Sequence, residues 1–265
     1  MTKNKYNIII ADPAKNITVF VLDDIDRNLY KSVARDILEN TNYGAEQVGF
    51  IKKPIMGGDI RLEMMGGEFC GNASRSIGML FATQNNIKKG NVLVEITGSD
   101  IPLNTSVDLD KGTSKIEMPI PKKIENIEVQ GLGEFPIVII DGINHIIAEN
   151  IVATEANFEL FKKAVYENYD IEAFGVMFFD REKEYITPVV YVKDTDTTFF
   201  ESSCGSGTLA TVSYLGKDLK DGHLKYNINQ PGGTIEAEIY KENGKIKKIT
   251  IGGVVKLSSK IEIEL

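Results

Sequence analysis

Hydrophobic and polar positions follow two different periods along this chain of 265 residues. Apolar residues spaced three and four positions apart predict helices over 28–41 and 158–170. Each helix leads into an apolar segment that predicts a buried strand, EQVGFI in the first case and FGVMFF in the second. Elsewhere, apolar residues alternate with polar ones on both sides of glycine-containing turns, which predicts β-hairpins. These turns contain Gly98, Gly112, Gly232 and Gly244.

Two further helices are predicted, each directly after a cysteine. The stretch GGEFCGNASRSIGML places Cys70 in a glycine-flanked turn, and FESSCGSGTLATVSYL repeats this design around Cys204. After both turns, apolar residues recur at helical spacing: Ile77, Leu80 and Phe81 in the first stretch, and Leu209, Val212 and Leu215 in the second. The chain contains only these two cysteines, and almost half of its length separates them.

The order of the predicted elements recurs, which indicates an internal duplication. Each half consists of strands, a helix, strands, the helix that begins at a cysteine, and further strands. The boundary falls in MPIPKKIENIE, residues 118–128. We therefore predict two homologous α+β halves, 1–120 with Cys70 and 121–265 with Cys204. A C-terminal strand at about 256–265 is expected to pack on the first half.

Composition and charge exclude several classes of protein. Hydrophobic residues make up 42% of the chain and aromatic residues 8%, which is enough to build hydrophobic cores. The net charge of −8 argues against nucleic acid or an anionic membrane as a partner. No apolar run reaches the roughly 18 residues that a membrane span needs, and the N-terminal apolar run is too short for a signal peptide. We therefore expect a cytoplasmic protein, in which two cysteines are not expected to form a structural disulfide.

The position of each cysteine predicts its chemistry. At a helix N-terminus, free backbone N–H groups and the helix dipole favour a negative charge. The thiolate should therefore be favoured over the thiol, and a substrate carboxylate could bind to the same N–H groups. Gly71 and Gly205, which follow the two cysteines, allow the backbone to approach a ligand closely.

If pseudo-two-fold symmetry brings the halves together, the two thiols face each other across a cleft. One cysteine could then remove a proton from a carbon beside a carboxylate while the other returns a proton to the opposite face. The helix N-termini would stabilise the charge that develops on the carboxylate. This arrangement predicts racemisation without a cofactor. A metal site is disfavoured because two cysteines and two histidines lie far apart in the sequence.

The two cysteine turns resemble those of the diaminopimelate epimerase family of cofactor-independent amino-acid racemases and epimerases. That family carries CGN in its first half and CG(T/S)G in its second, and the similarity extends through KNIT, EQVGF, NHII and NQPGG over nearly the whole chain. The resemblance implies two pseudo-symmetric halves, each a curved and mostly antiparallel sheet or barrel around a central helix, with the active site between them. Within the family, EQVGFI, EFCGNA, SCGSGT and QPGG are most similar to the histidine racemases of metallophore synthesis.

The resemblance also implies roles for individual residues. His145 and Glu201 match proton-dyad partners of the two cysteines. Glu46 would favour a substrate side chain that donates hydrogen bonds or carries positive charge, unless it is only a surface charge. The α-groups of the amino acid would be held by Asn16, Asn72 and the backbone at Gly71, Gly205 and Ser206.

Alternatives remain open for several of these residues. His145 could be a buried structural histidine. The role of Arg75 could be limited to capping its helix or pairing with another residue of the same helix. Ser202 stands where diaminopimelate epimerases carry an arginine for the distal carboxylate of their substrate, which disfavours that substrate. We expect a monomer or homodimer that acts on a small-molecule amino acid, with histidine preferred. The alternatives are diaminopimelate or another amino acid as substrate, or a protein of the same fold that only binds an amino acid.

Overall fold

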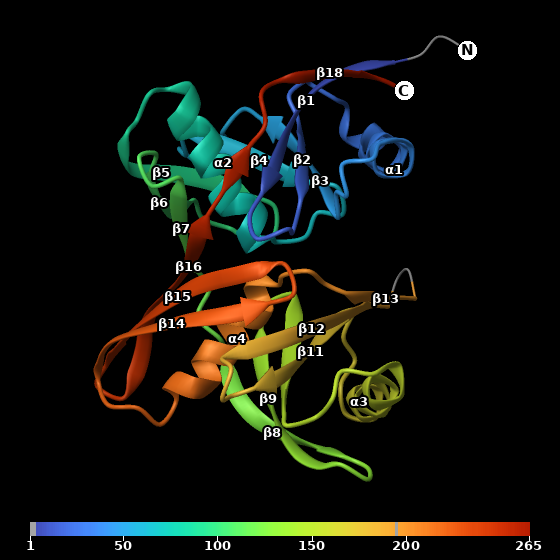
Figure 1. The fold of residues 1–265 in the computed structure, drawn as a ribbon, viewed down its shortest axis with the longest axis vertical. Coiled ribbons are helices and arrows are strands. Elements are labelled where there is room, and N and C mark those ends of the chain that lie inside the picture. The colour runs from blue at the N-terminus through green and yellow to red at the C-terminus, as the bar shows by residue number, and fades with distance from the viewer. Residues whose placement is uncertain (1–3, 194–195) are drawn as a thin grey trace. The chain divides into compact units, whose positions relative to one another are not determined.

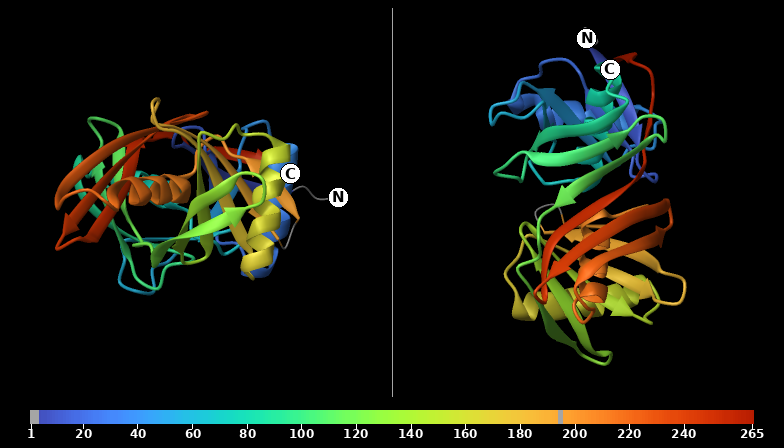
Figure 2. Two further views of the ribbon diagram at one scale, coloured as in Figure 1. Left: turned by 90° about the horizontal axis from the view of Figure 1, so that it is seen from below. Right: turned by 90° about the vertical axis from the view of Figure 1, so that its left-hand side faces the viewer.

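The chain folds into two units of strands and helices (Figures 1 and 2). The computed structural model describes residues 4–193 and 196–265, so residues 1–3 and 194–195 of the predicted domains lie outside the described residues. Unit 1 comprises Met1–Glu117 and Gly252–Leu265, and unit 2 comprises Met118–Ile251. Unit 1 thus ends at Glu117, whereas the sequence analysis expected the first half to end at residue 120. The chain returns to unit 1 at Gly252, and the C-terminal strand was expected from about residue 256.

Unit 1 contains a mixed sheet with two helices. In chain order its elements are β1 (Lys5–Asp12), β2 (Thr18–Val21), a short 3-10 helix (Arg27–Leu29), α1 (Tyr30–Asn40), β3 (Gln47–Lys52), β4 (Ile60–Met64), α2 (Gly71–Gln84), β5 (Lys89–Ile96), β6 (Leu103–Asp108), β7 (Thr113–Met118), β17 (Lys256–Leu257) and β18 (Ile261–Glu264). Strands β2 and β3, which flank α1, pair in parallel, and so do β4 and β5, which flank α2. The pairs β1–β2, β3–β4, β5–β6 and β6–β7 are antiparallel. Strand β1 also pairs with β17 and β18, which fixes the C-terminal segment to unit 1.

Unit 2 is also a mixed sheet with two helices. Its elements are β8 (Lys123–Val129), β9 (Gly133–Ile140), β10 (Ile143–Glu149), α3 (Glu155–Asn168), β11 (Ala173–Asp180), β12 (Tyr185–Val192), β13 (Thr197–Phe200), α4 (Gly205–Gly216), β14 (Gly222–Gln230), β15 (Gly233–Glu242) and most of β16 (Lys245–Val254). The parallel pairs are β10–β11 around α3 and β12–β14 around α4. The pairs β8–β9, β9–β10, β11–β12, β12–β13 and β14–β15 are antiparallel.

Helices α2 and α4 are each buried within their own unit. Helix α2 contacts β1, β4, β5 and β6, and α4 contacts β9, β10, β11, β14 and β15. Both helices are rich in glycine, alanine, serine and threonine, so strands can pack closely around them. Their buried hydroxyl groups donate to carbonyls one turn earlier, as Ser76 does to Asn72 and Thr211 does to Gly207. The polar side chains therefore do not prevent burial of the helix.

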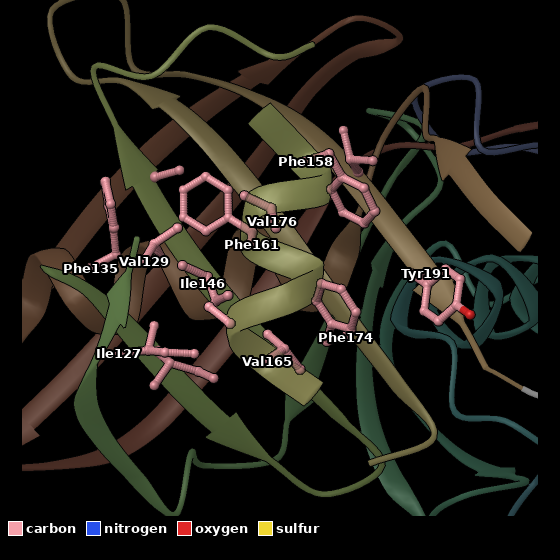
Figure 3. Close-up of a cluster of buried hydrophobic side chains, with 14 of the residues drawn as sticks. Ile127, Val129, Phe135, Ile146, Phe158, Phe161, Val165, Phe174, Val176 and Tyr191 are labelled. Carbon is pink, nitrogen blue, oxygen red and sulfur yellow. The ribbon is translucent and has the colours of Figure 1, made fainter. Parts of the chain in front are cut away.

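Helices α1 and α3 cover separate hydrophobic cores. In unit 1, the ring of Tyr30 on α1 stacks on that of Phe50 on β3, with 3.8 Å between the ring centroids. In unit 2, Figure 3 shows Phe158, Phe161 and Val165 of α3 among side chains from the surrounding strands. This packing explains why the periodic apolar positions of both segments form helices.

The structure confirms the four predicted helices and the four predicted hairpins. The segments predicted at 28–41 and 158–170 form α1 and α3, and the segments after the cysteines form α2 and α4. The glycine turns join β5 to β6, β6 to β7, β14 to β15 and β15 to β16. Gly98, Gly112 and Gly244 adopt positive φ angles that favour glycine. In the described part of the chain, no helix is both long and apolar enough to cross a membrane.

Candidate active site

In unit 1, Cys70 is the N-cap residue of α2, as its glycine turn predicts. Its backbone is extended, and its sulfur accepts a hydrogen bond from the backbone N–H of Ala73 at 3.4 Å. The side chain of Cys70 is partly exposed. The sulfur therefore occupies the place that a serine or aspartate oxygen takes in an ordinary helix cap, where donors favour negative charge.

A chain of hydrogen-bonded side-chain amides reaches this sulfur through Gln47. Nε2 of Gln47, on β3, lies within hydrogen-bond distance of three acceptors, which share its two hydrogens: Cys70 Sγ at 3.2 Å, Asn16 Oδ1 at 3.0 Å and Thr18 Oγ1 at 2.9 Å. Asn72 Nδ2 also donates to Asn16 Oδ1, at 3.2 Å. Two of the residues expected to hold the α-groups, Asn16 and Asn72, are thus in direct contact and almost fully buried.

Glu46 is attached to the same network. Its carboxylate accepts a hydrogen bond of 2.6 Å from Asn16 Nδ2. Its backbone N–H donates to Ile17 O, which places Glu46 just before β3 and beside the loop after β1. Glu46 is therefore an exposed charge that contacts one of the predicted substrate-binding residues, Asn16.

In unit 2, Cys204 caps α4 in the same way. Its sulfur accepts from the backbone N–H of Gly207 at 3.3 Å, and its own N–H donates to Gln230 Oε1 at 2.7 Å. Gln230 also donates to Thr208 Oγ1 at 2.9 Å. A Cβ on Gly207 would lie 2.1 Å from Met177 Sδ and 3.2 Å from Cys204 Sγ, so a larger residue at this position would require Met177 to move.

The structure places His145 one side chain away from Cys204. His145 Nε2 lies 2.9 Å from Ser206 Oγ, which in turn lies 3.5 Å from Cys204 Sγ. His145 is fully buried, and burial lowers the pKa of its imidazole from 6.5 to about 3. The ring is therefore neutral. Within residues 4–193 and 196–265, its Nδ1 has no hydrogen-bond partner, and it lies against Gly175, where a Cβ would approach to 2.4 Å.

The expected preference for thiolate is wrong for Cys204. Burial raises the pKa of this thiol well above its usual value, and the charge and hydrogen bonding of Glu201 raise it further. Hydrogen bonds from Ser206 and from the N–H of Gly207 act in the opposite direction and are outweighed. Desolvation of the charged form thus exceeds the stabilisation by the helix N-terminus. Cys204 rests as a thiol beside the Glu201 carboxylate.

The sequence-based selection of site residues omitted two glutamines. Gln47 donates to Cys70 Sγ, and Gln230 accepts from the backbone of Cys204. Each glutamine also contacts a threonine hydroxyl, Thr18 in unit 1 and Thr208 in unit 2. Their positions within EQVGF and NQPGG were visible in the sequence, but their contacts require strands that are distant from the cysteines along the chain.

Comparisons with known proteins agree with these features. Residues 5–263 match a family model described as "Histidine racemase CntK N-terminal domain". A protein named histidine racemase from Fusobacterium nucleatum subsp. nucleatum is 38% identical over 242 residues, covering 87% of each chain. Two solved structures share the fold at low identity.

The first of these structures is a hydroxyproline epimerase from Agrobacterium vitis, with a TM-score of 0.69 and 10% identity over 98% of this chain and 93% of that one. The second is a phenazine biosynthesis protein PhzF family member from Enterococcus faecalis, with a TM-score of 0.61 and 17% identity over 99% and 100% of the two chains. The fold is therefore a sheet-rich α+β fold of the kind found in these proteins. The family match covers nearly the whole chain, and the chain belongs to the histidine racemase family of isomerases.

Proposed function

We propose that this protein interconverts the enantiomers of histidine by proton transfer at the α-carbon between Cys70 and Cys204. The observation that carries the proposal is that both cysteines of the chain are N-cap residues of a buried helix, and that each sulfur accepts the backbone N–H three residues later. One acid and one base are required to move a proton between the two faces of a carbon. The mechanism needs no cofactor.

The proposal includes two pseudo-symmetric halves whose cysteines face a shared cleft. Support comes from the order of strand pairing. From β1 to β6, successive pairs are antiparallel, parallel, antiparallel, parallel and antiparallel. The same order runs from β9 to β15, with α3 and α4 in the places of α1 and α2. A duplication would place Cys70 and Cys204 at equivalent positions.

The surroundings of Cys204 support a role as the proton donor in one direction. The thiol is buried beside Glu201, which stabilises its protonated form. When Cys204 must instead act as the base, Glu201 can accept the thiol proton. Ser206 then assists. If His145 carries its proton on Nε2 and not on Nδ1, Nε2 donates to Ser206 Oγ, and the Ser206 hydroxyl can donate its own hydrogen to the sulfur.

Histidine as the substrate is supported by the relatives named histidine racemase. Glu46 adds a physical reason, because a carboxylate beside Asn16 favours a substrate side chain that donates hydrogen bonds. Ser202 offers no cationic partner for a second carboxylate, unlike the arginine of diaminopimelate epimerases. In this proposal, Asn16, Asn72 and the N–H groups at Gly71, Gly205 and Ser206 hold the α-groups.

The proposal is tested by solvent-deuterium exchange. The reduced protein is incubated in D₂O, without added cofactor, with L-histidine, L-lysine, L-glutamate or diaminopimelate, and loss of the α-proton NMR signal is followed. We expect exchange with histidine alone, accompanied by formation of D-histidine. Exchange only with diaminopimelate would overturn the substrate assignment. If monodisperse protein exchanged none of these amino acids, the racemase proposal would be wrong.

A further inference from the structure

Arg75 is a fully buried arginine on α2, one turn after Asn72. Its Nε donates to Asn72 Oδ1 at 3.1 Å. At the other end of the guanidinium, Nη1 donates to the carbonyls of Gly253 and Val254 at 3.1 and 3.3 Å. The backbone of Arg75 is held as well, because Ser114 Oγ donates to its carbonyl at 2.9 Å. The guanidinium is thus fixed between the C-terminal part of unit 1 and the polar residues around Cys70.

In the series of hydrogen bonds from Arg75 to Glu46, each residue can be the donor only toward Glu46 and the acceptor only toward Arg75. A guanidinium donates and never accepts, so Asn72 must turn Oδ1 toward Arg75 and Nδ2 away from it. Asn72 Nδ2 therefore donates to Asn16 Oδ1, and Asn16 must turn its own Nδ2 to another acceptor. That acceptor is the carboxylate of Glu46, a group that only accepts when ionised. A pure donor at one end and a pure acceptor at the other fix both amides.

The orientation of Asn16 also determines which group of Gln47 faces the sulfur of Cys70. Because Asn16 presents Oδ1, Gln47 must meet it with Nε2 rather than with its carbonyl oxygen. The same Nε2 lies 3.2 Å from Cys70 Sγ. The sulfur therefore faces an N–H donor. If Asn72 and Asn16 were reversed, Gln47 could turn its oxygen toward the sulfur instead, which would repel a thiolate.

We propose that Arg75 is a positioning residue of the active site, which orients Asn72 and Asn16 so that Gln47 directs a donor at Cys70. This inference rests on the proposed function for its catalytic meaning, since it gives Arg75 the task of preparing Cys70 for proton transfer. The arginine acts through these amides and touches neither the sulfur nor the reacting carbon. It also explains why a charged side chain is buried in α2, where an apolar residue would otherwise be expected.

The test measures Cys70 without relying on racemisation. In the full-length Cys204→Ser protein, Cys70 is the only thiol, and its rate of alkylation by iodoacetamide reports how much thiolate is present. We expect Arg75→Met to slow this alkylation at least about threefold, because the sulfur partly loses one hydrogen bond. In protein labelled with ¹⁵N at Asn and Gln side chains, the amide signals of Asn16, Asn72 and Gln47 should shift together.

Two further variants keep the experiment decisive. Ser114→Ala is the matched control, because it removes a buried hydrogen bond to the backbone of Arg75 and leaves the guanidinium in place. It should change neither the alkylation rate nor the amide signals. Arg75→Lys keeps a buried positive charge, but a single ammonium cannot replace the planar fork that joins Asn72 to the two carbonyls. It should give an intermediate alkylation rate and serves in place of Arg75→Met if that protein does not fold.

The outcomes separate this inference from the proposed function. If a folded Arg75 variant has the alkylation rate and amide signals of its parent, Arg75 has no positioning role. An equal effect of Ser114→Ala would also overturn the inference, since general loosening of α2 would then explain the result. If both measurements respond as expected and the unmodified protein exchanges no α-proton, the inference stands and the racemase proposal fails.

Discussion

Lowering the pH from 7.5 to 5.0 should destabilise this protein because His145 is buried in its neutral form. Burial lowers the pKa of His145 from 6.5 to about 3. Between these two values, the unfolded chain binds a proton at this position and the folded chain does not. Unfolding therefore becomes more favourable as the pH falls through 6.5, and the loss continues until the pH approaches 3.

The magnitude follows from proton linkage. An unfolded histidine with a pKa of 6.5 is about 97% protonated at pH 5.0, whereas the folded His145 is almost entirely neutral. The free energy of unfolding should therefore fall by about 2 kcal/mol between pH 7.5 and 5.0 from this residue alone. In His145→Gln, the side-chain amide can still donate toward Ser206 but has no proton to gain, so this contribution should vanish.

Two measurements check the prediction. An NMR titration of the His145 ring should show no change in its ¹³Cε1 shift between pH 8 and 5. Urea unfolding followed by circular dichroism should give a free-energy loss about 2 kcal/mol smaller for His145→Gln than for the unmodified protein over the same pH change. His223→Gln, which removes the exposed histidine beside Glu238, is the control and should retain the loss due to His145. A His145 ring that titrates near pH 6.5 would refute the reasoning.

Three further predictions concern the thiols and a close glycine contact. Cys70→Ser and Cys204→Ser should each abolish racemisation of histidine measured by chiral chromatography, and near-normal turnover in either would contradict the two-base mechanism. In the Cys70→Ser background, Glu201→Gln should speed alkylation of Cys204, because the carboxylate that raises the pKa of this thiol is removed; a slower reaction would assign Glu201 the opposite effect. Gly175→Ala should lower the free energy of unfolding in urea by about 1–3 kcal/mol, because its Cβ would approach His145 Nδ1 to 2.4 Å; unchanged stability would show that the ring can move aside.

The elements of each unit were predictable because their signals are local. Helical spacing after Cys70 and Cys204 and alternation around Gly98 and Gly244 depend only on residues near each other in sequence. The same is true of the helix caps, since an N-cap sulfur contacts a backbone N–H only three residues away. The sequence also places the candidate site at these caps, because the cysteine turns are its most specific motifs.

The tertiary structure alone decides what surrounds each sulfur. Gln47 reaches Cys70 only because the fold brings the first residue of β3 to the residue that caps α2, and no spacing in the sequence encodes that contact. The pKa of Cys204 is likewise set by burial and by Glu201, which overcome the preference for thiolate expected from its helix position. Local sequence thus determines which groups sit at the helix ends. Burial and distant partners determine their protonation and orientation, because desolvation and hydrogen bonding depend on every segment packed around them.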